Sequence, residues 1–338
     1  MKWWILKKKL KTARMKNWIF AFVFITIGLF ACKTKAVQTE NVPTNYAANS
    51  IAYTLKYPFK TQTIKLSNGI EISYSDTGIL RGTPLVFVHG LGSYMRAWDK
   101  NVVSLAADYR CLRVDLAGYG KSSKGKYKGD MSFYADVISE FCTKLKLKKV
   151  ILVGHSMGGQ IALTTAMLYP TLVEKLILVD PAGFETFNTL QKMTLKNLTS
   201  PAAIQNASEM QIRQSFASNF YKMPEDAQFM VDDRLKMRST TDFGTYCYVV
   251  AQNVYGMLDE PVYTKLSRIT QPVLCFFGKN DALIPNKYMN PLQTTEGVAK
   301  SGASKMKNCE VVMLPEAGHF SMWEKADSLN KRVKAFLN

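Results

Sequence analysis

The strongest chemical signal in the sequence is a serine between two glycines, in the segment G-H-S-M-G at residues 154–158. An apolar run rich in Val and Leu precedes it at residues 150–153, and a run compatible with a helix follows at residues 160–163. The pattern G-x-S-x-G between a strand and a helix is typical of a sharp turn that presents the serine hydroxyl above a sheet. The dipole at the start of the following helix favours negative charge there. We therefore predict that Ser156 is a nucleophile.

A serine hydroxyl needs a base to take its proton, and a histidine base needs a carboxylate to orient its ring. The sequence has three histidines, and His319, just past a predicted strand end, is the one outside the other motifs. Asp281 follows another predicted strand end, and Asp180 follows a third. We predict His319 as the base and Asp281 as its partner. Asp180 is the rival acid, and its alternative role is a turn before Pro181.

Four further segments carry recognisable patterns. They are V-F-V-H-G-L-G at 86–92, D-L-A-G-Y-G-K-S at 115–122, F-G-K-N-D-A-L-I-P at 277–285 and E-A-G-H-F at 316–320. With these segments the chain resembles the α/β-hydrolase family over residues 60–338. The order Ser, Asp, His along the chain is also the order in that family.

The resemblance implies roles for residues around the serine. The backbone N–H groups of Leu91 and Met157 would form the oxyanion hole, since these positions follow the H-G motif and the nucleophile. His89 would hold the oxyanion loop, and His155 would be a packing residue. Relatives that are dehalogenases or epoxide hydrolases place aspartate where this chain has Ser156. No pair of histidines has the spacing of metal ligands, so we expect no metal and no cofactor.

Elements that would position these residues alternate along the chain. Seven short apolar runs predict strands, at residues 70–74, 85–89, 111–115, 150–154, 176–180, 273–277 and 310–314. Helical patterns lie between them, at residues 132–147, 157–169 and 327–337 among others. Such alternation predicts an α/β fold, with a mostly parallel sheet of the eight-stranded type and helices on both faces. Residues 60–183 and 269–338 form the predicted core, and residues 184–268 a helical cap inserted after the sixth strand.

The predicted function is hydrolysis of an apolar acyl ester through an acyl-enzyme. Residues 184–270 hold nine basic and nine acidic residues, and they are rich in Met and aromatic side chains, which suit an adaptable apolar pocket. One alternative is a carbon–carbon bond hydrolase of the ring-fission-product type, for which Arg96 and Arg213 are the candidate carboxylate-binding groups. Another is a non-catalytic binding module of the same fold, which would not require an intact Ser, Asp and His.

The formal net charge of +18 indicates the kind of binding partner only when the N-terminal segment is counted separately. Seven basic residues and no acidic ones lie in residues 1–31, which leaves +11 for the rest. We interpret this remainder as a solvated basic surface, because the lysines at 121–128 are interleaved with Ser and Gly and match no nucleic-acid-binding module. We therefore expect no nucleic-acid partner, and the sequence does not indicate an oligomeric state.

The N-terminus has the features of a targeting signal. A basic stretch is followed by 14 apolar residues, 18–31, fewer than the roughly 20 that span a bilayer. The run ends in L-F-A-C, which resembles a bacterial lipoprotein signal. This implies a signal peptide over residues 1–31, starting at Met1 or Met15, and a lipid on Cys32. An uncleaved membrane anchor is the alternative.

Residues 32–59 are polar and predict a tether between the lipid and the folded core. We expect the mature protein in the bacterial cell envelope, bound to a membrane. Lys33 follows the lipidated cysteine in place of the aspartate that retains some lipoproteins at the inner membrane. The resemblance therefore favours the periplasmic side of the outer membrane.

Overall fold

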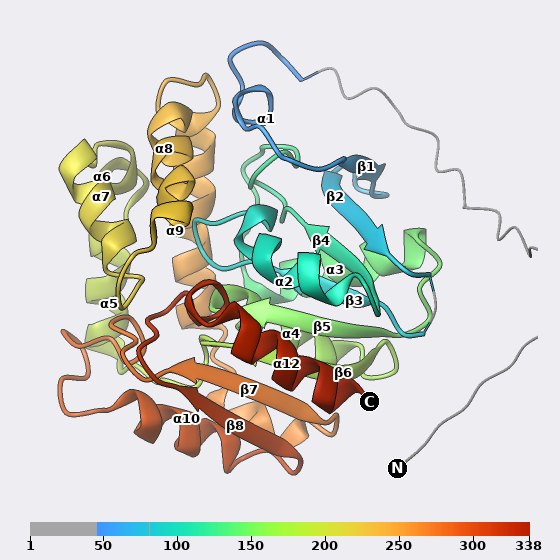
Figure 1. The fold of residues 1–338 in the computed structure, drawn as a ribbon. Coiled ribbons are helices and arrows are strands. Elements are labelled where there is room, and N and C mark those ends of the chain that lie inside the picture. Colours follow the sequence, from blue (N-terminus) through green and yellow to red (C-terminus); the bar gives the residue numbers. More distant parts are fainter. Residues whose placement is uncertain (1–45, 81) are drawn as a thin grey trace, which may run out of the picture. The chain divides into compact units, whose positions relative to one another are not determined.

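The computed structural model describes residues 46–80 and 82–338, and its centre is a mixed sheet (Figure 1). The strands are β1 (Gln62–Lys65), β2 (Glu71–Gly78), β3 (Leu85–Val88), β4 (Arg110–Val114), β5 (Val150–His155), β6 (Val173–Val179), β7 (Val273–Gly278) and β8 (Cys309–Leu314). They lie in the order β1-β2-β4-β3-β5-β6-β7-β8. β2 pairs antiparallel with β1 and with β4, and the remaining pairs are parallel. The predicted mostly parallel sheet is confirmed.

Helices cover both faces of this sheet. One face packs against α3 (Met131–Lys144), α4 (Met157–Leu168) and α10 (Thr295–Ala303), and the other against α2 (Asp99–Leu105), α11 (Ser321–Glu324) and α12 (Ala326–Leu337). Successive strand residues point to opposite faces. In β3, Val86 and Val88 therefore join one buried cluster and Leu85 and Phe87 the other. Burial on both faces explains why this strand reads as a continuous apolar run.

The segment between β6 and β7 is helical, as predicted for a cap inserted after the sixth strand (Figure 1, yellow to orange). It contains α5 (Thr189–Leu198), α6 (Pro201–Gln205), α7 (Glu209–Ala217), α8 (Gln228–Met237) and α9 (Phe243–Asp259), with 3₁₀ turns at Glu225–Ala227 and Tyr263–Arg268. Buried side chains of α9 pack into the larger core cluster. This helix therefore fixes the cap to the core, and α5, α6 and α7 have at most one buried residue each.

The predicted tether needs correction at its C-terminal end. Ser50 caps the short helix α1 (Ile51–Thr54), and Ile51 and Leu55 are buried in the core cluster. The backbone N–H of Ile51 donates to Asp242 at the start of α9, at 2.9 Å. Two apolar residues four positions apart share one helix face, so this segment belongs to the folded body in spite of its polar composition.

The predicted signal peptide at residues 1–31, its Cys32 and the tether up to residue 45 lie outside the described residues. Within residues 46–80 and 82–338, no helix is long and apolar enough to cross a lipid bilayer. Membrane attachment through Cys32 stays a prediction.

Candidate active site

Ser156 lies in a strained turn between β5 and α4. Its backbone has φ 52° and ψ −119°, a region that non-glycine residues rarely adopt and that occurs mainly at functional sites. Both flanking positions need glycine, because backbone atoms of other residues lie too close for a side chain. A Cβ atom on Gly154 would lie 2.3 Å from the carbonyl oxygen of Gly158, and one on Gly158 would lie 2.3 Å from that of Val88. The pattern G-x-S-x-G therefore has a steric cause, and the turn leaves Ser156 half-buried among buried neighbours.

The structure brings Ser156, His319 and Asp281 together in one chain of hydrogen bonds. Nε2 of His319 lies 2.8 Å from Oγ of Ser156, and Nδ1 of His319 lies 2.7 Å from Oδ2 of Asp281. His319 lies in the loop after β8, and Asp281 in the loop after β7. With the proton on Nδ1 donated to the carboxylate, Nε2 is free to accept the serine proton.

Asp281 is itself held in place by its own loop. Its Oδ1 accepts the backbone N–H groups of Leu283 at 2.7 Å and Ile284 at 3.0 Å. The residues Asp281 and His319 are each only 3% exposed. Burial alone would lower the pKa of His319, but the Asp281 carboxylate raises it, and the net pKa lies above the ordinary value. The imidazole is therefore a stronger base than a buried histidine without a carboxylate partner.

Asp180, the rival acid, forms its hydrogen bonds with residues other than His319. Its Oδ1 accepts the N–H of Gly278 at 2.7 Å, and its Oδ2 accepts the Ser321 hydroxyl at 2.5 Å. Gly278 precedes Asp281 by three residues, and Ser321 follows His319 by two. Burial, together with the negative charge of Asp281, raises the pKa of Asp180. Asp180 thus connects the two loops that carry the acid and the base.

The other two histidines hold backbone groups near the serine. Nδ1 of His89 donates to the carbonyl oxygen of Gly90 at 2.8 Å, and its Nε2 accepts the N–H of Leu116 at 3.1 Å. Nε2 of His155 donates to the carbonyl oxygen of His319 at 2.8 Å. Burial lowers the pKa of both rings, most strongly that of His155, which also faces the charge of His319. Both rings are therefore neutral, and His155 supports the base as well as packing beside it.

The predicted oxyanion donors flank the serine. Met157 is the first residue of α4, and a Cβ atom on Gly90 would lie 3.1 Å from Cβ of Ser156, so the loop that continues into Leu91 runs against the nucleophile. Within the part of the chain that the structure describes, neither the Leu91 N–H nor the Met157 N–H donates to another residue. Both donors remain available to an oxygen bound at Ser156.

A cavity of about 270 Å³ lies beside this loop, under the cap. Its wall is mostly apolar, with Leu91, Ile204, Ile212, Phe216, Phe243, Val250 and Phe320 among the lining residues. Leu91 of the oxyanion loop and Phe320, the residue after His319, both line the cavity. The described residues include no group of three His, Cys, Asp or Glu side chains placed to hold a metal ion.

Among the lining residues that the sequence did not single out, one is charged, Arg234 on α8. Of the two arginines named from the sequence, Arg96 pairs with Asp99 and Arg213 with Glu209. Neither lines the cavity. The nine basic residues of the cap look alike in the sequence, because only the packing of the cap helices decides which one faces the cavity.

Comparison with known proteins shows what this chain is similar to. A family model described as alpha/beta hydrolase fold matches residues 83–326. The dihydrolipoyllysine-residue acetyltransferase component of an acetoin cleaving system from Pseudomonas putida is 32% identical over 257 residues, which are 76% of this chain and 64% of that protein. The chain thus spans less than two thirds of the length of this relative.

Two further relatives match nearly their full length. A 2-hydroxy-6-oxononadienedioate/2-hydroxy-6-oxononatrienedioate hydrolase from Burkholderia vietnamiensis is 28% identical over 282 residues, 79% of this chain and 91% of that protein. The crystal structure of a probable hydrolytic enzyme from Pseudomonas aeruginosa superposes with a TM-score of 0.75 at 22% identity, over 84% of this chain and 96% of the other. The second likeness establishes the fold only.

Proposed function

The chain belongs to the α/β-hydrolase fold family, and from that premise we propose that it is a serine hydrolase that cleaves an apolar acyl ester. The observation that carries the proposal is the continuous chain of hydrogen bonds from Ser156 through His319 to Asp281. The strained turn at Ser156 and the two unused N–H donors beside it supply the remaining parts of an acyl-transfer site.

The proposed reaction has two halves. Oγ of Ser156 attacks the ester carbonyl as its proton moves to Nε2 of His319, and the carbonyl oxygen becomes an oxyanion held by the N–H groups of Leu91 and Met157. His319 then protonates the leaving alcohol, and the acyl group stays on Ser156. In the second half His319 takes a proton from water, and the resulting hydroxide attacks the acyl-enzyme. His319 then returns the proton to Oγ of Ser156 as the bond to the acyl group breaks and the acid leaves. Asp281 stabilises the imidazolium in both halves.

The experiment that tests this proposal is covalent labelling with a fluorophosphonate, followed by turnover of p-nitrophenyl esters of graded chain length. We expect the wild-type protein to be labelled, and Ser156→Ala to lose labelling and about 10⁴–10⁶ of kcat. A folded Ser156→Ala variant that is still labelled and still active would remove the serine from the mechanism. Another residue would then be the nucleophile, whereas a wild-type protein that is neither labelled nor active would favour the non-catalytic binding module.

Carbon–carbon bond hydrolysis is the second candidate, because the relative from Burkholderia vietnamiensis is named for such a substrate and matches 79% of this chain. The same nucleophile and base would serve either reaction. A comparison of kcat/KM on p-nitrophenyl butyrate and on a coloured ring-fission dienoate ranks the two. Faster turnover of the dienoate than of any ester would replace the esterase proposal.

We also propose that the protein is attached to a bacterial envelope membrane through a lipid on Cys32. The support is in the sequence alone, in the basic stretch and apolar run that end in L-F-A-C at residue 32. Cys32→Ala should release the protein from the membrane fraction or block its maturation. Intact-mass analysis that finds a cleaved, soluble protein with unmodified Cys32 would contradict the proposal.

A further inference from the structure

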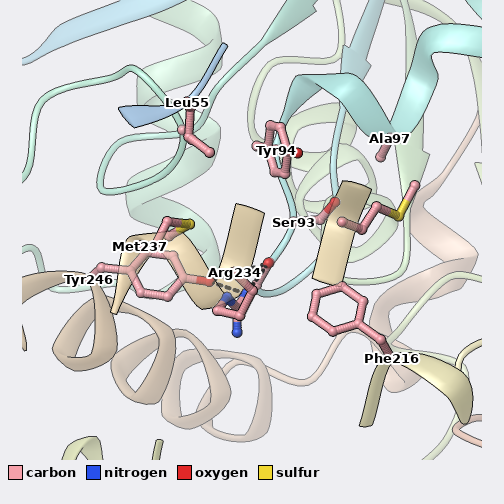
Figure 2. A pocket seen from close by; sticks show the side chains of 11 residues that line it. Leu55, Ser93, Tyr94, Ala97, Phe216, Arg234, Met237 and Tyr246 are labelled. Carbon is pink, nitrogen blue, oxygen red and sulfur yellow. Dashed lines mark hydrogen bonds between the residues drawn. The ribbon is translucent and has the colours of Figure 1, made fainter. Parts of the chain in front are cut away.

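The cavity under the cap has a smaller neighbour beside Arg234 (Figure 2). Four residues line both spaces, and they are Gly92, Ser93, Phe216 and Arg234. The smaller pocket has a volume of about 10 Å³, which is room for one water molecule. Leu55 lines only this pocket, and Figure 2 shows its side chain on the other side of Arg234 from Phe216. The pocket is therefore an almost filled extension of the cavity, with Leu55 in its wall.

The N-terminal segment holds Leu55 in place between the cap and the core. Leu55 directly follows α1 and is 1% exposed. Its N–H donates to the carbonyl oxygen of Ile51 at 2.9 Å, and the N–H of Ile51 donates to Asp242 of the cap. Two residues after Leu55, the Tyr57 hydroxyl donates to Asp115 of the core at 2.7 Å. The segment is thus attached on both sides of Leu55, which makes this side chain a fixed part of the wall.

The rest of the wall suits an alkyl chain. Met230 and Met237 contribute flexible apolar side chains, which adapt to the shape of a ligand. The Tyr94 hydroxyl donates to a carboxylate of α8 at 2.6 Å, and the Tyr246 hydroxyl accepts from Nη2 of Arg234. Because these polar atoms have partners within the protein, the surface left for a ligand is mainly apolar.

We propose that Leu55 limits the length of the alkyl chain that the protein accepts in its substrate. The inference rests on the proposed function, because it takes the cavity of about 270 Å³ as the site of the ester. An alkyl chain that extends from this cavity past Ser93 enters the smaller pocket and soon meets Leu55. The family model matches residues 83–326, so the limit comes from a segment that precedes the matched region.

Shortening the Leu55 side chain gives the size of the expected effect. Leu55→Ala removes three carbon atoms, which makes room for two or three methylene groups of a substrate. A buried methylene group changes kcat/KM about fourfold, which corresponds to about 0.8 kcal/mol. An ester that is longer by two or three carbons should therefore gain about 15- to 60-fold in kcat/KM over the wild-type value. In the wild-type protein close packing leaves no such room, so the same carbons lower kcat/KM.

The test measures kcat/KM against chain length in two series of esters. One series varies the acyl chain, from p-nitrophenyl acetate to p-nitrophenyl dodecanoate, and the other varies the alcohol chain, from methyl acetate to decyl acetate. The wild-type protein should show a maximum in one series, and Leu55→Ala should move this maximum to chains two or three carbons longer. Leu55→Phe should move it to shorter chains. The series in which the maximum moves identifies the part of the ester that lies next to Leu55.

Ile51→Ala is the matched control, because Ile51 is buried in the same segment and does not line the pocket. This variant should lower the stability without moving the maximum. If Leu55→Ala leaves the maximum in place, or if Ile51→Ala moves it as far, the inference is overturned. Leu55→Val removes one carbon atom and takes the place of Leu55→Ala if that variant does not fold. It should move the maximum by one carbon, and an unmoved maximum again overturns the inference.

A binding measurement keeps the inference separate from the proposed function. If the protein hydrolyses no ester and takes no fluorophosphonate label, the proposed function fails. Calorimetric titration of Ser156→Ala with methyl alkyl ketones of increasing length, which resemble esters but are not hydrolysed, still tests Leu55. The affinity should rise up to a limiting chain length, and adding Leu55→Ala should extend that length by two or three carbons. An unchanged limit refutes the inference.

Discussion

Replacing Asp281 with asparagine tests how the base at His319 is oriented and charged. The carboxylate accepts from Nδ1 of His319 at 2.7 Å, and both groups are buried. A hydrogen bond of this charged kind contributes about 1.5–3 kcal/mol, and one pKa unit corresponds to 1.36 kcal/mol. Asp281→Asn should therefore lower the pKa of His319, because it removes the group that raises this pKa and leaves burial, which lowers it.

The assay is kcat/KM for p-nitrophenyl butyrate between pH 5 and 9. His319 must be neutral to accept a proton, so activity falls as the pH drops through its pKa. In the wild-type protein this acid limb should lie above the ordinary pKa of histidine, about 6.5, since the carboxylate raises it. In Asp281→Asn the limb should move to lower pH, while the plateau falls about 10⁴-fold because the imidazole loses the group that fixes its tautomer.

Asp180→Asn is the matched control, because Asp180 is also buried and yet forms its hydrogen bonds with residues other than His319. Its raised pKa favours the neutral carboxyl, which an amide resembles in shape. The plateau should fall no more than about tenfold, the effect of about 1.4 kcal/mol. If Asp180→Asn removes the activity and Asp281→Asn keeps it, the two acids have been assigned the wrong way round. An acid limb that does not move in Asp281→Asn would refute the electrostatic argument.

Further substitutions probe the supports of the site and the packing of α1. Gly90→Pro distorts the loop that lies against Ser156 and should lower kcat about 10²–10³-fold, and wild-type activity in a folded variant would contradict the oxyanion assignment. His89→Ala leaves the buried N–H of Leu116 unpaired, while the Gly90 carbonyl still accepts the Ser93 N–H at 3.2 Å. The variant should lower the free energy of unfolding in urea by about 1–3 kcal/mol, and an unchanged value would refute a supporting role. Ile51→Ala should lower the free energy of unfolding by about 2–5 kcal/mol, and Tyr53→Ala, at an exposed residue, by less than about 0.5 kcal/mol. Equal effects would show that this segment is a tether and not part of the folded body.

The nucleophile could be predicted from the sequence because its determinants are local. The strand, the turn and the helix around Ser156 are contiguous, and each flanking glycine is required by contacts within 2.3 Å. The central strands were equally clear, since burial on both faces makes them uniformly apolar. β1 was missed because an edge strand of the sequence Gln-Thr-Ile-Lys carries no such run. The sheet was therefore predicted except at its polar edge.

Arg234 could not be predicted, because its role depends on contacts far away in the chain. Gly92 precedes it by 142 residues, and the orientation of α8 decides that this side chain meets the loop. The neighbouring Asp233 takes a different direction and accepts from the Tyr94 hydroxyl at 2.6 Å. Of these two adjacent charged residues, Arg234 faces the cavity and Asp233 has a structural role. No rule of sequence spacing predicts which of them faces the cavity.

The choice between Asp281 and Asp180 illustrates the same limit inside the core. β6 and β7 are adjacent and parallel, so the loops after them begin at the same edge and bring both acids near the base. The sequence shows two carboxylates at equivalent strand ends, but only the loop after β7 turns its carboxylate to Nδ1 of His319. Two negative charges at this depth would repel each other, and the raised pKa of Asp180 relieves that repulsion by favouring its neutral form. Asp180 can then connect the acid and base loops through Gly278 and Ser321 without competing for the imidazolium. The two acids therefore have complementary roles, because Asp281 contacts the base and Asp180 holds the two loops, while both acids raise the pKa of His319.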